Sequence, residues 1–261
     1  MTIRRTDSDK VEQYTHMLME AAAAEGRSAR DLQQLRHALK FSPEMLETIA
    51  RMDNANEDYL LDQVYREFKE RMDNGDLTIS VGKVYDGKTI MLCESEDFED
   101  GVTVKLNGGS VANVTNITKD WLPKGLDTEK DGQHNGENYL AYTFYLKNTG
   151  DKDLEYNTKM EVTGASKSSD EAVRFQIYRN GEDQVFAKGQ YDDRSKPEED
   201  ATAFVDDKTV YTAQATPLKA GEVDKYTVVI WIEGNDPQCV DDIRCGSVRS
   251  HMVFDVVPDV K

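Results

Sequence analysis

Long apolar runs are missing from this chain of 261 residues. A helix that crosses a membrane needs about 20 consecutive, mostly apolar residues, and no stretch of the sequence approaches that length. Residues 1–18 begin with basic side chains and continue with mixed charges, so they lack the apolar segment of a secretory signal. We therefore expect no membrane span, and a chain that is either cytoplasmic or exported by a route that the sequence does not reveal.

Cysteine is scarce, with only Cys93, Cys239 and Cys245 in the chain. Three cysteines do not make a disulfide scaffold, and none of them has the C-x₂-C spacing of a zinc site. Five residues separate Cys239 from Cys245, and a compact turn would bring their Cα atoms within the roughly 7 Å that a disulfide needs. We predict a bridge between these two in an oxidising compartment, and two free thiols in a reducing one.

Signatures of hydrolytic enzymes are absent as well. The sequence contains neither the H-E-x-x-H of zinc peptidases nor the G-x-S-x-G of serine hydrolases. Of the four histidines, His134 and His251 form a metal site with a carboxylate only if the fold brings them together. Cys93 lies among acidic residues, whose negative charges disfavour a reactive thiolate. We therefore predict that the protein is not an enzyme.

Basic residues are fewer than acidic ones. The chain has 32 Lys and Arg and 50 Asp and Glu, which gives a net charge of −18. Residues 1–75 hold 11 basic and 15 acidic side chains, and the remaining residues hold 21 and 35, so the acidity is concentrated after residue 75. A field of this sign repels nucleic acids and anionic membranes. Nucleic acid is therefore excluded as a predicted partner.

Acidic residues gather in the segment EGNDPQCVDD, which follows a predicted strand. Its Asp236, Asp241 and Asp242 are candidate ligands for Ca²⁺, which takes six to eight oxygen atoms from a bent loop. The segment does not match the D-x-D-x-D-G calcium loop, so a solvated acidic loop is the simpler interpretation. No cofactor other than this calcium ion is predicted.

The chain has two parts with different hydrophobic periods. Over residues 1–74, apolar side chains recur at helical spacing between capping residues, which predicts four short amphipathic helices in a small bundle over 1–75. A helix-turn-helix over 28–53 is disfavoured because this segment has no basic face. The bundle is expected to dock a partner or to solubilise the chain.

From residue 76 onward the period is two, which is typical of strands. Strands are predicted at 77–84, 102–106, 110–118, 138–150, 225–234 and 247–257, with a hairpin over 172–189 that turns at Asn180-Gly181. Residues 119–137 and 192–208 are polar and predicted to be surface loops. The predicted fold class is α+β, with the N-terminal bundle followed by a jelly-roll-like β-sandwich over 76–261.

Four segments resemble one family of bacterial proteins. They are NVTNITKDWLPKGLD (113–127), HNGENYLAYTFYLKNTGD (134–151), EAVRFQIYRNGE (171–182) and DKYTVVIWIEGNDPQCVDDI (224–243). Together they are similar to the camelysin/TasA-like surface and biofilm-matrix proteins, over about residues 101–256. The resemblance implies a jelly-roll sandwich, an extracellular location and assembly into fibres by strand exchange. The chain departs from the family in its helical N-terminal region, in the lack of a visible signal peptide and in Cys245, where a pair of glycines is expected.

The expected function is a non-enzymatic structural, adhesive or assembly module with a protein partner or with itself as the partner. The first alternative is a camelysin-type metallopeptidase, and the second is a cytosolic interaction adaptor. If the protein assembles, the exchanged element is predicted to be the first strand, with Leu77, Ile79 and Val81 on one face. The intact chain is expected to stay monomeric, because the upstream helical region adds bulk where a donor strand must thread.

Overall fold

The computed structural model describes residues 75–258, except residues 86, 100, 112, 113 and 245, together with His16, Met19 and Glu20. The chain divides into two compact units, Met1–Asn74 and Gly75–Lys261. This division falls where the hydrophobic period of the sequence changes. The four predicted helices lie outside the described residues apart from those three helical positions.

The predicted α+β class is wrong for the part of the chain that the structure describes. That part consists mainly of β-strands, and its longest α-helix is the four-residue α5 (Leu126–Glu129). The described residues after position 75 also contain three short 3-10 helices: η1 (Lys119–Trp121), η2 (Ser169–Glu171) and η3 (Asp241–Ile243). No helix among the described residues is long and apolar enough to cross a membrane.

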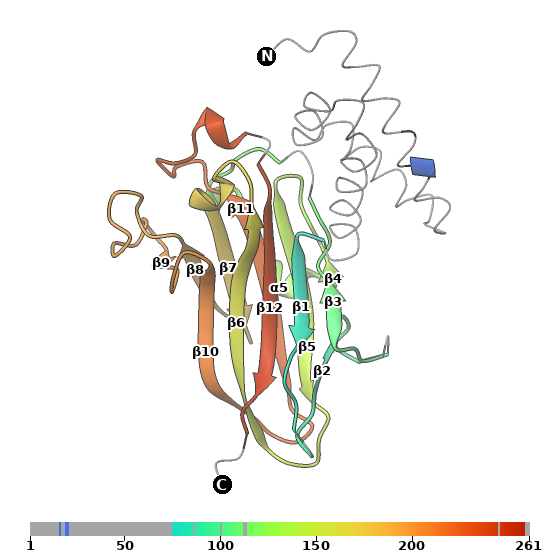
Figure 1. Ribbon diagram of the computed structural model, residues 1–261. Helices are drawn as coiled ribbons and strands as arrows, with labels where there is room; N and C mark the ends of the chain where they lie inside the picture. The colour runs from blue at the N-terminus through green and yellow to red at the C-terminus, as the bar shows by residue number, and fades with distance from the viewer. Residues whose placement is uncertain are drawn as a thin grey trace, which may run out of the picture. The chain divides into compact units, whose positions relative to one another are not determined.

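The strands form two sheets that pack as a β-sandwich (Figure 1). The first sheet has the order β10 (Thr209–Leu218), β6 (Leu154–Ala165), β12 (Val248–Val256), β1 (Leu77–Val81) and β3 (Lys105–Asn107). The second has the order β2 (Ile90–Cys93), β5 (Tyr139–Asn148), β11 (Val223–Ile232), β7 (Val173–Arg179), β8 (Glu182–Ala187) and β9 (Thr202–Ala203), with β4 (Gly132–Gln133) also paired to β5. The β-rich part of the prediction is thus confirmed at the level of a two-sheet sandwich.

Alternating side chains of the two sheets form the main core. Leu140, Tyr142, Phe144 and Leu146 of β5 are buried between the sheets, as the period of two predicts. The centre is aromatic: the Phe254 ring lies 5.1 Å from that of Tyr226 and 5.9 Å from that of Phe144. Edge-to-face ring pairs of this kind stabilise a core beyond the area that they bury.

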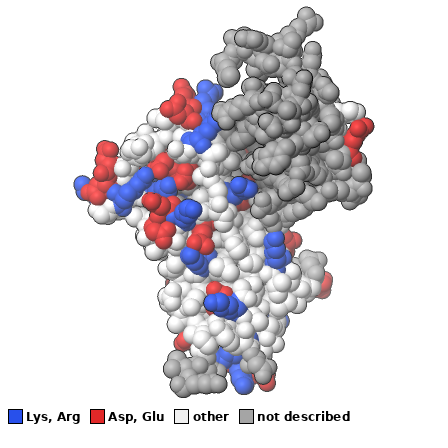
Figure 2. Space-filling view, viewed as in Figure 1, with Lys and Arg blue, Asp and Glu red and all other residues white. Residues whose placement is uncertain are grey.

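The outer faces of the two sheets differ. The first sheet presents exposed and half-exposed polar residues such as Lys159 and Glu161 of β6, and Figure 2 shows side chains of both charges interspersed on this face. The outer face of the second sheet is covered instead. Ala141, Val229 and Trp231 are buried there in a second apolar cluster.

The residues that cover this face come from the predicted strand 110–118 and from the predicted polar surface loop 119–137, and for part of that loop the prediction is wrong. Ile117 and Leu126 belong to the second cluster, and Leu122 packs against it. The apolar residues stand too far apart to show a strand or helix period, yet they are enough to anchor the segment on the sheet. Covering the sheet removes apolar side chains from water on both of its faces.

Of the remaining predictions, the hairpin over 172–189 is confirmed and the strand over 110–118 is wrong. The hairpin is confirmed as β7–β8, with Asn180 and Gly181 at φ values of 52° and 88°, as a type I′ turn requires. The predicted strand 110–118 is wrong, since its described residues form only an isolated bridge between Ile117 and Glu233. The strands β2, β4, β6, β9 and β10 were not predicted, and β4 and β9 lie in segments that were predicted to be surface loops.

Candidate functional site

The candidate exchange strand β1 lies inside the first sheet, one position from its edge. It pairs in parallel with β12, from Leu77 beside Ser250 to Val81 beside Phe254. On its other side it pairs antiparallel with the three-residue β3. The regular strand ends at Val81, three residues earlier than predicted, although Gly82 still donates its N–H to the Phe254 carbonyl at 2.9 Å.

Two side chains of β1 fill the core. Leu77 and Ile79 are fully buried, and Val81 is partly buried against the same cluster. Gly108 makes room for Leu77, since a Cβ atom at that glycine would lie 2.9 Å from Leu77 Cδ2. The predicted apolar face is therefore the face that anchors the strand, and every strand partner of β1 comes from a distant part of the chain.

The three candidate calcium ligands have different surroundings. Asp236 is buried, and its carboxylate accepts hydrogen bonds from Arg174 Nη2 at 2.7 Å and from the Gln238 N–H at 2.7 Å. Asp241 has an almost fully exposed side chain, and Asp242 is also exposed. Among the described residues, no three His, Cys, Asp or Glu side chains lie close enough together to hold a metal ion.

The surroundings of Asp236 predict that calcium has no effect on stability. Both carboxylate oxygens already have protein donors, and a ligand stabilises a fold only when it binds the folded state more tightly than the unfolded one. We expect the same melting temperature in millimolar Ca²⁺ and in chelator. A calcium-dependent rise that Asp241→Asn or Asp242→Asn removes would instead assign the site to this loop.

The two candidate histidines lie at different sheets. His134 Nε2 lies 3.0 Å from the hydroxyl of Thr143 on β5, whereas His251 Nε2 on β12 lies 2.7 Å from the hydroxyl of Ser80. Burial lowers the pKa of both imidazoles, because the charged form loses hydration. Each histidine therefore acts as a local hydrogen-bonding group in its own sheet.

The cysteine prediction lies partly outside the described residues, because Cys245 is not among them. Cys239 is a free thiol whose sulfur accepts a hydrogen bond from Asn116 Nδ2 at 3.2 Å. Cys93 is buried, with its sulfur 3.5 Å from the Ser95 hydroxyl. The bridge between Cys239 and Cys245 stays a prediction.

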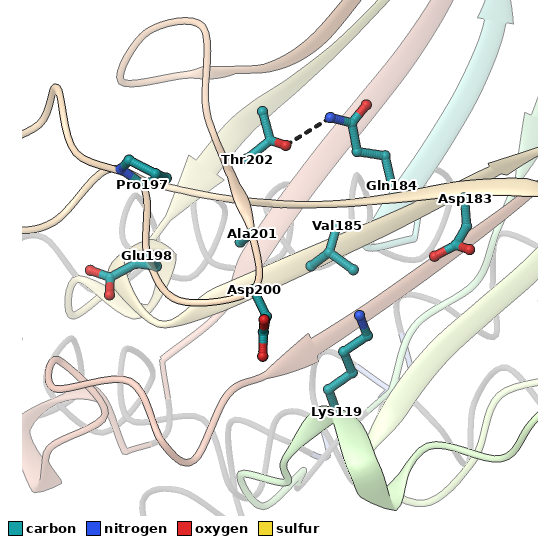
Figure 3. Close-up of a pocket in the computed structure, with 9 residues that line it drawn as sticks. All are labelled: Lys119, Asp183, Gln184, Val185, Pro197, Glu198, Asp200, Ala201 and Thr202. Carbon is teal, nitrogen blue, oxygen red and sulfur yellow. Dashed lines mark hydrogen bonds between the residues drawn. The ribbon is translucent and has the colours of Figure 1, made fainter.

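A groove beside β8 was not anticipated from the sequence. It has a volume of about 500 Å³, and Figure 3 shows its lining. The lining residues are Lys119, Asp183, Gln184, Val185, Pro197, Glu198, Asp200, Ala201 and Thr202. They come from three separate segments, so no local motif marks them. The only sequence signal was the acidity of residues 192–200.

Comparisons with known proteins assign no family to this chain. No family model matches it, and no curated protein matches it. Among solved structures it is similar to two crystal structures of β-glucosidase from Kluyveromyces marxianus. One has 15% identity and a TM-score of 0.22 over 66% of this chain, and the other, in complex with glucose, has 10% identity and a TM-score of 0.25 over 92%. This chain spans 16% and 34% of those two proteins, and similarity at this level carries no argument about function.

Proposed function

We propose that residues 75–258 form a non-enzymatic assembly or adhesive module of the bacterial surface and matrix type, with β1 as the exchangeable strand. The position of β1 carries this proposal. It is the first strand of its unit, and it holds its place through β12, β3 and a buried apolar face. The resemblance of four segments to camelysin/TasA-like proteins supports the same function.

Exchange of β1 between two copies would preserve both its backbone pairing and its buried side-chain contacts. A β1 segment from a second copy would offer the same N–H and C=O groups to β12 and the same two buried side chains, Leu77 and Ile79, to the core. Backbone pairing and apolar burial are therefore equivalent within one copy and between copies. The segment after Val81, which joins β1 to β2 (Ile90–Cys93), would have to straighten for β1 to leave its own sheet. The residues before Leu77 decide what has to be accommodated at the junction between copies.

We propose that the intact chain is monomeric and that it acts at the cell surface or outside the cell. Residues 1–74 directly precede β1, so a donor strand would have to bring 74 further residues to every junction between subunits. Removing them frees the start of β1 for exchange. Comparing the amounts of native protein in culture medium, cell-surface extract and cytoplasm tests the location.

Truncation at residue 76 is predicted to promote assembly. We expect a chain that begins at Asp76 to form species whose size increases with concentration, whereas the full chain remains monomeric, because only the truncated chain has an unencumbered donor strand. Light scattering and fibre imaging measure the difference. If neither chain assembles at any concentration, the assembly proposal loses its main support. If both assemble equally, residues 1–74 do not block exchange.

The protein is predicted to have no peptidase activity. Its two candidate metal-binding histidines lie at different sheets, and each already has a hydroxyl neighbour, Thr143 or Ser80. We expect no cleavage of casein by the pure protein with or without added zinc. Cleavage that a chelator stops and that His134→Ala abolishes would establish the metallopeptidase alternative. An inert, monomeric and intracellular protein would favour the adaptor.

A further inference from the structure

The edge of the second sheet is only half covered at β8. The two-residue β9 pairs with Phe186 and Ala187 at the end of β8. The first four residues, 182–185, pair with β7 on one side, and no strand among the described residues pairs with them on the other. Glu182, Asp183 and Gln184 are exposed at this unpaired edge, and Val185 is 7% exposed but lines the groove beside it.

The register shows which backbone groups the open edge presents. The hairpin closes between Arg179 and Glu182, so alternate residues of β8 hydrogen bond to β7, beginning with Glu182. The N–H and C=O groups of Asp183 and Val185 consequently point away from β7. Ala187, two residues further along, follows the same alternation, since its outward carbonyl accepts the Phe204 N–H at 2.7 Å.

The other edges of the sandwich are protected. Strand β10 contains two register irregularities and Pro217, which disrupt a regular edge. Strand β3 is only three residues long. Strand β2 is bridged by backbone hydrogen bonds in both directions between Leu92 and Thr103. Among the described strands, β8 thus combines an open edge with a groove.

The groove lies directly beside this edge and has a distinct charge. Asp183, Glu198 and Asp200 provide three carboxylates, and Lys119 is the basic residue among the described residues of the lining. Asp183 and Lys119 point toward each other across the groove, while Gln184 Nε2 donates to the Thr202 hydroxyl at 2.7 Å (Figure 3). An occupant would meet both backbone donors and acceptors and an excess of negative charge.

We infer that the groove beside β8 binds an extended, basic peptide segment, which adds as a strand to residues 182–185. Main-chain hydrogen bonds to Asp183 and Val185 supply the strand addition, and lysine or arginine side chains pair with Asp183, Glu198 and Asp200. A second copy of this chain fits less well, because its net charge of −18 opposes an acidic groove. The inference is independent of strand exchange, since β1 lies in the other sheet.

The test uses the full-length protein and a blocked hexapeptide of alternating lysine and threonine. We expect binding at low salt that shifts the amide resonances of Asp183 and Val185 and weakens as ionic strength rises. A peptide with glutamate in place of lysine should bind at least about tenfold more weakly, because each like charge replaces an attraction with a repulsion. N-methylation of the peptide backbone should abolish binding, since it removes the donors of the added strand.

Protein variants separate this site from general acidity. Asp183→Asn with Asp200→Asn should weaken binding about fivefold to tenfold, and asparagine suits the positive φ of 56° at residue 200. Asp151→Asn with Glu155→Gln removes two exposed charges outside the groove and should change binding less than about twofold. The inference would be overturned if the two double variants weakened binding equally. It would also be overturned if the N-methylated peptide bound as tightly as the unmodified one, or if the basic peptide did not bind at low salt.

Discussion

Replacing Leu77 with aspartate is expected to lower the free energy of unfolding by more than about 4 kcal/mol, enough to unfold a marginal domain. Leu77 is fully buried in the main core, at the first position of β1. The change removes about 1.5–3 kcal/mol of apolar burial and places a carboxylate in a cluster of buried apolar side chains. An unpaired buried charge adds several kcal/mol more, even after its pKa shifts.

Denaturant unfolding, followed by the fluorescence of the buried Trp231, measures this loss. Val84→Asp is the matched control, because it also replaces an apolar residue with aspartate but at a position that is 48% exposed. We expect the control to change stability by less than about 0.5 kcal/mol. If Leu77→Asp were as mild as Val84→Asp, β1 would not be part of the core in solution, and the basis of the proposed function would disappear.

Replacing Asp236 with alanine is expected to cost about 3–5 kcal/mol, because it leaves the buried guanidinium of Arg174 without its partner. The side chains of Arg174 and Asp236 are 5% and 0% exposed, and their closest atoms are 2.7 Å apart. Thermal and denaturant unfolding measure the effect. Asp241→Ala is the control from the same loop, since its side chain is 94% exposed, and it should have almost no effect.

A double variant shows whether the loss of stability in Asp236→Ala comes from the unpaired charge of Arg174 or from the space that the shortened side chain leaves. Arg174→Met with Asp236→Leu replaces the ion pair with apolar side chains, a change that is often neutral or stabilising in buried sites. We expect it to recover most of the stability lost by Asp236→Ala. A double variant as unstable as the single one would mean that the Gln238 N–H contact and the shape of the loop, rather than the unpaired charge, account for the loss.

The sequence predicted best those strands whose inward-facing positions are all apolar or aromatic, or whose turn has a characteristic residue pair. Alternation in β5 placed Tyr142 and Phe144 correctly in the core, and the Asn180-Gly181 pair located the β7–β8 hairpin. Strand β6 carried the same kind of signal, with Leu154, Tyr156, Met160 and Val162 at alternate buried positions. It was missed because the polar Thr158 interrupts the inward apolar positions and charged residues stand between them, so that the segment resembles a polar loop.

Features that depend on distant parts of the chain were not predictable in this way. Asp236 was interpreted as a candidate metal ligand, and its partner Arg174 lies 62 residues earlier in the chain. The parallel pairing of β1 with β12 joins the two ends of the β-rich unit, and nothing local in either strand specifies it. The groove beside β8 depends on the same kind of long-range contact, because three segments come together to form it.

Inhibition of assembly by a free β1 peptide tests the central claim most directly. A chain that begins at Asp76 would be mixed with a synthetic peptide of residues 76–82, and particle size would be followed by light scattering. If β1 exchanges between copies, the peptide occupies the position beside β12 and limits assembly in proportion to its concentration, while the same peptide with Leu77→Asp has no effect. Assembly that is indifferent to both peptides, or that continues in a chain lacking β1, would contradict the account.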